Sequence, residues 1–131
     1  MVRELIYNEI ATAMNDYDNS IYCTQKYELQ PKSIPCAFIE LISKARMRGY
    51  ADLNNTDHQH RYTFEVQVIA NSLSKAYEMI GVAETEFKAL SFFEEYCEPI
   101  DNRDVKLSRI VARFSAQVDD EQLISTLTES E

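Results

Sequence analysis

The spacing of apolar residues changes once, abruptly, within residues 60–90, and this change constrains the fold more than any other feature. Over residues 60–70 apolar and polar side chains alternate, with Phe64 and Val66 on one face and Glu65 on the other. Strict alternation is typical of a strand with one buried face, because successive side chains point to opposite sides of a sheet. We therefore expect a β-strand over residues 60–70.

A helix is expected to follow this strand directly. The apolar residues now recur at intervals of three and four: Leu73, Ala76, Ile80, Ala83, Phe87 and Leu90. This spacing forms one stripe of a helix, and the hydroxyl of Ser72 or Ser74 would cap the free amide hydrogens of its first turn. An apolar strand face followed by an apolar helix stripe predicts a helix packed across a sheet, with Phe64 and Phe87 buried between them.

The same reasoning predicts the other elements. We expect a helix over residues 3–17 and strands over residues 21–29, 36–44, 92–100 and 105–118. The second of these strands is expected to continue into a long hairpin with its tip near residues 54–58. A slip in the alternation of the last strand predicts a β-bulge near Ser108 and Arg109. Together these elements predict an α+β fold, in which a mostly antiparallel sheet packs against an N-terminal helix and one long central helix.

The length and composition predict one domain. The chain has 131 residues with only two glycines and three prolines, and it contains no low-complexity linker. We expect residues 1–118 to form a single α+β domain. Residues 119–131 contain five acids and no base, so they are predicted to be an acidic C-terminal tail, either loose or a short frayed helix.

The net charge argues against binding to nucleic acid. It is −9 at pH 7, whereas binding to phosphates needs clustered lysine and arginine. No apolar run approaches the length that spans a membrane, and the N-terminal MVRELIYNEI lacks a secretory signal pattern. We expect no membrane partner, and synthesis in a cytoplasm.

The sequence offers little chemistry for catalysis. The two glycines, Gly49 and Gly81, are too few for a phosphate-binding loop, and there is no Gly-x-Ser-x-Gly motif. Cys23, Cys36 and Cys97 are widely spaced, without a Cys-x-x-Cys pair, so we expect three reduced and partly buried thiols. The prediction is a protein that is not an enzyme and needs no cofactor.

The two histidines are close enough in the sequence to begin a metal site. His58 and His60 are two residues apart, so on a strand their rings would point the same way, and Asp52 and Asp57 are the nearest further ligands. A polar hairpin tip explains the same residues more simply, since this spacing carries no recognised motif. No metal site is predicted.

One surface pattern suggests an interface. Lys44, Arg46 and Arg48 alternate, so in a strand they would share one face, and an acidic stretch follows the central helix. A basic ridge and an acidic ridge on one chain allow copies to join head to tail, although an ordinary mixed surface is the simpler alternative. The acids expected to face those bases on a neighbouring copy are Glu94, Glu95 and Glu98.

The layout resembles a known family. An N-terminal helix and a hairpin lead to the aromatic strand YTFEVQVIAN, which runs into the striped helix SLSKAYEMIGVAETEFKAL, and the turn IDNRD leads to the closing strand RIVARFSAQVD. Over residues 3–119 this order and patterning resemble the tail terminator and tail-completion proteins of tailed bacteriophages.

The resemblance implies a structural protein of the virion, made in the host cytoplasm, with no catalytic residues to carry over. Such proteins form a hexameric ring on the end of the tail tube, stop its growth, and contact the tube protein and a neck or head-completion protein. Six copies would carry six times −9, or −54. A like-charged lumen would let DNA pass without specific binding.

Two other functions remain open from the sequence. A head-completion or neck connector protein would have an α+β fold of the same kind. A small ligand-binding α+β domain would instead use its open sheet face as a pocket. An enzyme is the remaining class.

Overall fold

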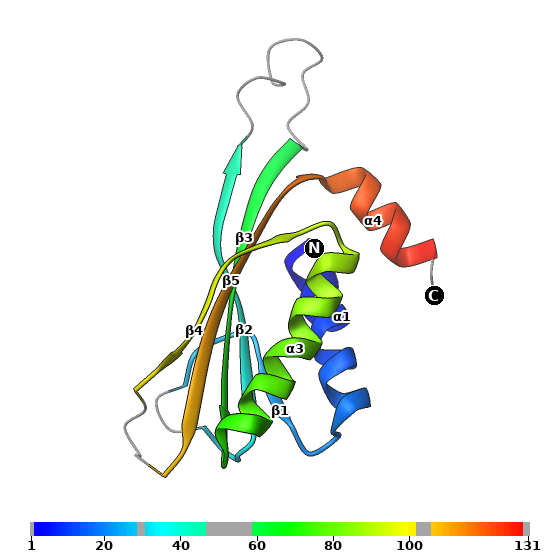
Figure 1. Cartoon of the computed structure of the whole chain (residues 1–131). Helices are drawn as coiled ribbons and strands as arrows, with labels where there is room; N and C mark the ends of the chain where they lie inside the picture. Colours follow the sequence, from blue (N-terminus) through cyan, green and yellow to red (C-terminus); the bar gives the residue numbers. More distant parts are fainter. Residues whose placement is uncertain (1, 29–30, 47–58, 102–105, 130–131) are drawn as a thin grey trace.

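The protein is built on one five-stranded sheet with the strand order β1-β2-β3-β5-β4. The computed structural model describes residues 2–28, 31–46, 59–101 and 106–129. Its elements, in chain order, are α1 (Val2–Tyr17), β1 (Tyr22–Thr24), β2 (Cys36–Arg46), β3 (Gln59–Ala70), α3 (Leu73–Ala89), β4 (Phe93–Ile100), β5 (Ser108–Asp119) and α4 (Asp120–Glu129). Only β1 and β2 pair in parallel. The predicted α+β class, with an N-terminal and a central helix, is confirmed (Figure 1).

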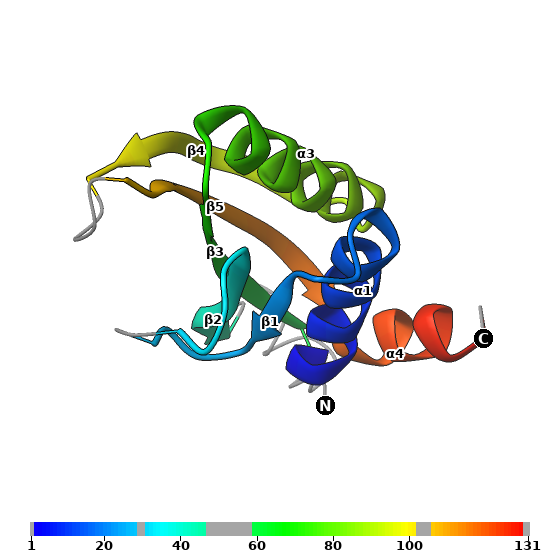
Figure 2. The same cartoon turned by 90° about the horizontal axis from the view of Figure 1, so that it is seen from below.

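Helices cover one face of this sheet, and none of the described helices lies on the other, here called the open face. Helices α1 and α3 lie side by side, with α3 over β3 and β5, and α4 lies against α1 (Figure 2). The main core lies between these helices and the sheet. Phe64, Val66, Ile80 and Phe87 are each at most 1% exposed, so the predicted packing of the central helix on the strand before it is confirmed.

Local chemistry explains where α3 begins and ends. The Oγ atom of Ser72 accepts a hydrogen bond from the amide of Lys75 at 3.2 Å, which confirms one of the two predicted caps. After α3 the chain reverses through Ser91, whose φ of 68° lies in the left-handed region. The amide of Phe92 then donates to the carbonyl of Phe87 at 2.9 Å. This turn starts β4 along the outer edge of the sheet.

The first predicted strand is too long. Residues 21–29 were expected to be extended, but β1 covers only Tyr22–Thr24. Beyond it the chain leaves the sheet, and Tyr27 packs edge-on against Phe38 at 5.3 Å between ring centroids. Phe38 belongs to a second, smaller cluster with Cys36 and Ile69 on the open face. An aromatic anchor on that cluster therefore replaces further strand pairing.

The predicted bulge near Ser108 and Arg109 is wrong. Strand β5 starts at Ser108 and pairs with β3 in unbroken register to Asp119. The slip in the sequence pattern arises because Leu107 precedes the strand and packs against the smaller cluster on the open face. The register shifts instead lie elsewhere, between Leu41 and Ser43 in β2 and between Glu94 and Tyr96 in β4.

The residues predicted as an acidic tail form the end of β5 and helix α4. Leu127 is buried, and Leu123 and Ile124 pack against the main core. The apolar residues of α4 thus attach it to the domain, while Glu121 is exposed. The predicted hairpin pairing is present from Cys36–Arg46 to Gln59–Ala70, whereas its tip at residues 54–58 lies outside the described residues.

Candidate assembly interface

The predicted basic and acidic residues lie at opposite edges of the sheet. Lys44 is in β2, in register with Tyr62 of β3, whereas Glu94 and its two acidic neighbours are in β4. Because β3 and β5 lie between β2 and β4, a contact between these charges requires two molecules. Arg48 and the side chain of Arg46 lie outside the described part of the chain.

Strand β4 forms the first of two free edges, and we call it the acidic edge. It pairs with β5 on one side only, and along its eight residues all but Cys97 are exposed. Its side chains include three large apolar groups in contact with solvent: Phe93 at 57%, Tyr96 at 36% and Ile100 at 36% exposure. An edge strand of this kind presents unpaired backbone groups together with apolar surface.

The register shift in β4 divides its acids between the two faces. Glu94 is level with the core residue Phe114, on the helix-covered side, whereas Glu98 is level with Val111, on the open face. Glu95 is the extra residue at the shift. The even spacing of Glu94 and Glu98 would place both on one face in a regular strand, so the shift separates them.

Glu84 of α3 joins the helix-covered side of this edge. Its carboxyl oxygen, that of Glu94 and the sulfur of Cys97 all lie within 4.8 Å of one another. The hydrogen bond to Glu94, with some burial, raises the pKa of Glu84 from 4.5 to about 7. Glu84 therefore keeps its proton, which it shares in the hydrogen bond to Glu94, up to near neutral pH. These are the one set of three potential metal ligands this close together in the residues that the structure describes.

Sequence reasoning missed Glu84. It is ten residues from Glu94, and no motif spacing links the two. The available signal was its position on α3, one residue after Ala83 and three before Phe87 on the buried stripe. A polar residue beside a buried stripe borders the sheet, but only the packing of α3 decides which strand it meets.

The second free edge is the outer side of β2, and we call its residues Ile39–Arg46 the basic edge. Strand β1 pairs with β2 only at Cys36, Ala37 and Phe38. Beyond these residues, none of the described strands pairs with the outer side of β2. Lys44 lies here with its side chain 48% exposed, and Ile42 is 38% exposed. The described residues of the sheet therefore leave two free edges, of which β4 carries three acids and the outer side of β2 carries Lys44 together with Glu40.

Lys44 also borders a cluster around Asp120, the first residue of α4. The Asp120 carboxylate accepts a hydrogen bond from the Tyr62 hydroxyl at 2.8 Å and lies 3.2 Å from Nδ1 of His60. The Lys44 ammonium lies 3.9 Å from that carboxylate and 5.6 Å from the centroid of the Tyr62 ring. Burial and the bond to Asp120 raise the pKa of Tyr62 above its usual range. The cluster ties α4 to β3.

Of the histidine pair and acids weighed as a metal site, only His60 lies within the described residues. His60 faces Asp120, and His58, Asp52 and Asp57 lie outside the described residues. Asp120 was missed as a partner because it belongs to the stretch predicted as a tail. The signal was the helical spacing of apolar residues after two acids, since acids favour the first turn of a helix.

Paired polar side chains cross the open face. Gln67 accepts a hydrogen bond from Arg109 Nε at 3.1 Å and donates to Glu65 at 2.9 Å. Glu65 also accepts from Arg113 at 2.9 Å, and the Arg113 guanidinium lies 5.3 Å from the centroid of the Tyr96 ring. This side of the sheet carries a ladder of paired charges, which does not favour its use as an apolar ligand pocket.

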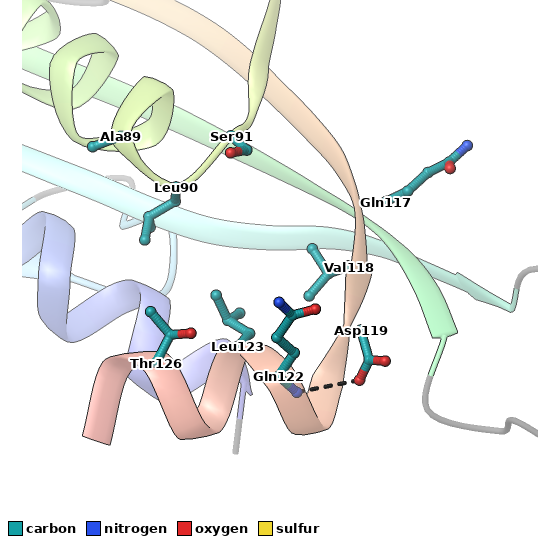
Figure 3. A pocket seen from close by; sticks show the side chains of 9 residues that line it. All are labelled: Ala89, Leu90, Ser91, Gln117, Val118, Asp119, Gln122, Leu123 and Thr126. Atoms are coloured by element: carbon teal, nitrogen blue, oxygen red, sulfur yellow. Dashed lines mark hydrogen bonds between the residues drawn. The ribbon is translucent and has the colours of Figure 1, made fainter. Parts of the chain in front are cut away.

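A pocket of about 280 Å³ opens between the end of α3 and α4 (Figure 3). Leu90, Val118 and Leu123 point toward it from three different elements. The Asp119 carboxylate accepts a hydrogen bond from the amide of Gln122 at 3.2 Å, which caps the first turn of α4. The acid in this pocket therefore has a structural role at a helix start.

The three thiols are free. Cys36 is buried, whereas Cys23 and Cys97 are half-buried, as predicted. Burial raises the pKa of each thiol to about 11. At neutral pH they are therefore protonated and poor nucleophiles.

Comparison with protein-family models and with curated proteins found no match. Across the described residues, no helix has the length and apolar character needed to cross a membrane. Among the described residues, the sheet has a helix layer on one face only and two free edges, one of which carries the acids of β4.

Proposed function

We propose that the protein is a tail terminator of a tailed bacteriophage. It forms a hexameric ring on the end of the tail tube, ends tube polymerisation, and joins the tail to the neck or head. Its partners are other copies of itself, the tube protein, and a neck or head-completion protein. It acts in the virion as a structural protein without a cofactor, and DNA passes through the ring without specific binding.

The observation that carries this proposal is the pair of free edges. A closed ring is built from heterologous contacts, which need two different and complementary patches on each copy. The acidic edge and the basic edge lie at opposite ends of one sheet, so one copy can contact a neighbour on each side. Lys44 on the basic edge is opposite in charge to the acids of β4, which favours contacts between unlike edges.

Two further features support the same function. The observed order of helices and strands is the one that the family resemblance implies over residues 3–119. The thiols are protonated at neutral pH, and Glu65, Gln67 and Arg113 of the open face bond with one another. The residues that the structure describes thus suit a role in assembly better than catalysis.

The test is assembly with tail tubes. The purified protein should bind the ends of growing tubes and give tubes of uniform length, and its mass on the tube should correspond to six copies. Reversing two bases together, Arg46→Glu and Arg48→Glu, should leave the subunit folded and produce tubes of uncontrolled length. The control reverses Lys26 and Lys32, which are exposed on the segment before β2 and give the same change in net charge.

The possible outcomes separate the candidate functions. A ring located at the head vertex rather than the tube end would assign the protein to the neck instead. Saturable binding of a small ligand without any ring would reject the proposal. If the double variant gives tubes of normal length, the proposal of a tail terminator stands, but these two bases are not part of its interface.

A further inference from the structure

We infer that neighbouring copies join by strand pairing, with the acidic edge of one copy forming an antiparallel pair with the basic edge of the next. The sheet would then continue from subunit to subunit. This inference deepens the proposed ring and rests on it for closure, but the pairing of two copies can be measured separately.

The backbone directions suit such a pair. Strands β2 and β3, β3 and β5, and β5 and β4 are each antiparallel, so β2 and β4 run in opposite directions within one copy. A second copy placed beside β4 in the same orientation therefore presents its β2 antiparallel to it. The helix layers of both copies then lie on the same side of the continued sheet. Unpaired backbone groups of Phe93–Cys97 and of the free segment from Ile39 onward would gain hydrogen bonds. The end of β4, from Glu98, would leave this pair, because β1 already pairs with the outer side of Cys36–Phe38.

The strand registers show which side chains would meet. Across one copy, Phe93 of β4 is level with Ser115 of β5, then with Thr63 of β3 and Ser43 of β2. With the sheet continued at this level, Phe93 of one copy would lie opposite Ser43 of the next. Both belong to the open face, because Thr63 alternates with the buried residues of β3.

Lys44 and Glu94 would then share the other face. Lys44 is level with Tyr62, and Glu94 is level with Phe114, and both of these partners lie in the main core under the helices. In the continued sheet Glu94 of one copy is therefore a diagonal neighbour of Lys44 of the next. Glu98 lies on the open face and cannot reach Lys44 in this arrangement.

Two copies of the same edge suit each other less well. Pairing β4 with a second β4 would place Glu94, Glu95 and Glu98 against the same acids, and like charges across a strand pair are destabilising. Pairing the two different edges sets Lys44 near Glu94 on one face, and on the open face it makes Glu40 a diagonal neighbour of Glu98. It also brings the exposed Ile42 of one edge near the exposed Phe93 of the other, so that both lose contact with water.

The protonation of Glu84 should change when the acidic edge of one copy meets the basic edge of the next. Glu84 faces Glu94 and Cys97 of β4, and Lys88 lines the same surface from α3. An approaching ammonium from Lys44 would favour the ionised form of both carboxyl groups and lower the pKa of Glu84. Association would then release a proton. We therefore expect tighter association at pH 8 than at pH 6.

A cross-linking experiment tests the strand pair directly. One batch of protein carries Phe93→Cys, and a second carries Ser43→Cys or, for a register shifted by two residues, Ala45→Cys. Mixing the two batches under mild oxidation should give a covalent dimer in one of these registers. Each batch alone should give none, which also controls for the native thiols. The matched negative control mixes Phe93→Cys with Gln117→Cys. Gln117 is an exposed position in β5, which is an interior strand paired on both sides.

Charge variants provide a second, independent test. In sedimentation experiments Glu94→Lys should weaken association about tenfold, and Glu98→Lys much less, because only Glu94 shares a face with Lys44. Adding Lys44→Glu to Glu94→Lys should restore the association. Equal effects of the two glutamate variants would contradict the predicted register.

The outcomes distinguish this inference from the ring itself. A ring of six copies that gives no cross-link in either register would overturn strand pairing while the tail terminator proposal stands. Cross-linked chains that never close on a tube would support strand pairing and reject the ring. Protein that stays monomeric at all concentrations and does not bind tube ends contradicts both.

Discussion

Phe87 of α3 stacks on Phe114 of β5, with ring centroids 4.4 Å apart and planes inclined by 12°. Phe64 and Phe92 complete the group, with their centroids 5.7 Å and 5.2 Å from that of Phe87. Phe87 and Phe64 are fully buried. This aromatic cluster therefore joins the central helix to the two middle strands and to the start of the acidic edge.

Replacing Phe87 by alanine should lower the free energy of unfolding by about 3–5 kcal/mol, because the substitution leaves a cavity surrounded by three rings. Urea unfolding monitored by circular dichroism measures the loss. Leu73→Ala is the control, since Leu73 is on the same helix but 49% exposed, and it should cost well under about 1 kcal/mol. Equal losses for the two variants would contradict this core.

Replacing Ser115 by alanine should leave the protein as stable or stabilise it by about 1 kcal/mol. The Ser115 side chain is fully buried in β5, and its hydroxyl has no hydrogen-bond partner among the described residues. Removing a buried, unpaired hydroxyl removes a desolvation cost. Thermal unfolding tests this, with Ser43→Ala at an exposed position as the control. A clear loss of stability for Ser115→Ala alone would show that the hydroxyl is satisfied.

Replacing Asp120 by alanine should destabilise the protein by about 1–3 kcal/mol, since it leaves the hydroxyl of the buried Tyr62 without its acceptor. The same change in a Tyr62→Phe background should cost less, because the donor is then absent. Hydrogen exchange should locate the loosening in α4. Identical costs in the two backgrounds would show that the Tyr62 bond does not hold the helix.

The Glu84 and Glu94 pair should make stability depend on pH. The pKa of Glu84 is raised in the folded protein, so the folded state binds more protons than the unfolded state between about pH 4.5 and pH 7. Stability should therefore fall as pH rises through this window. After allowance for solvent screening, Glu84→Gln should be about 1 kcal/mol more stable than the parent at pH 8, with little difference at pH 4.

The control for that pair is Glu86→Gln, which makes the same charge change on the same helix. Unfolding in urea at a series of pH values is the measurement. If Glu84→Gln and Glu86→Gln have the same pH profile, the two carboxyl groups do not share a proton.

Much of the fold could be predicted from local pattern. The change of period within residues 60–90 predicts β3 and α3, because a half-buried strand and a half-buried helix repeat at different intervals in any tertiary context. The cap at Ser72 is equally local, since a hydroxyl and an amide three residues apart meet within one turn. These features depend on the burial of one face, whatever lies opposite.

Pattern alone failed where a residue's role depends on a distant partner. Strand β1 ends early because Tyr27 packs against Phe38, which lies eleven residues further along the chain in β2. Leu107 gives the sequence pattern of a bulge, because it precedes the strand and packs against the smaller cluster on the open face. Both side chains have strand-like neighbours in sequence, and only tertiary packing decides which face they join.

The candidate interface shows the same division. The sequence by itself determined that one chain carries a basic ridge and an acidic ridge, because charge is a property of residue type. Only the tertiary structure decided that Lys44 and the acids of β4 lie on opposite edges of the described sheet and that Glu94 and Glu98 face opposite sides. It also placed Glu84 of α3 beside Glu94. Strand order, register and helix packing are long-range relationships, and they set the distances between charges on which an interface depends.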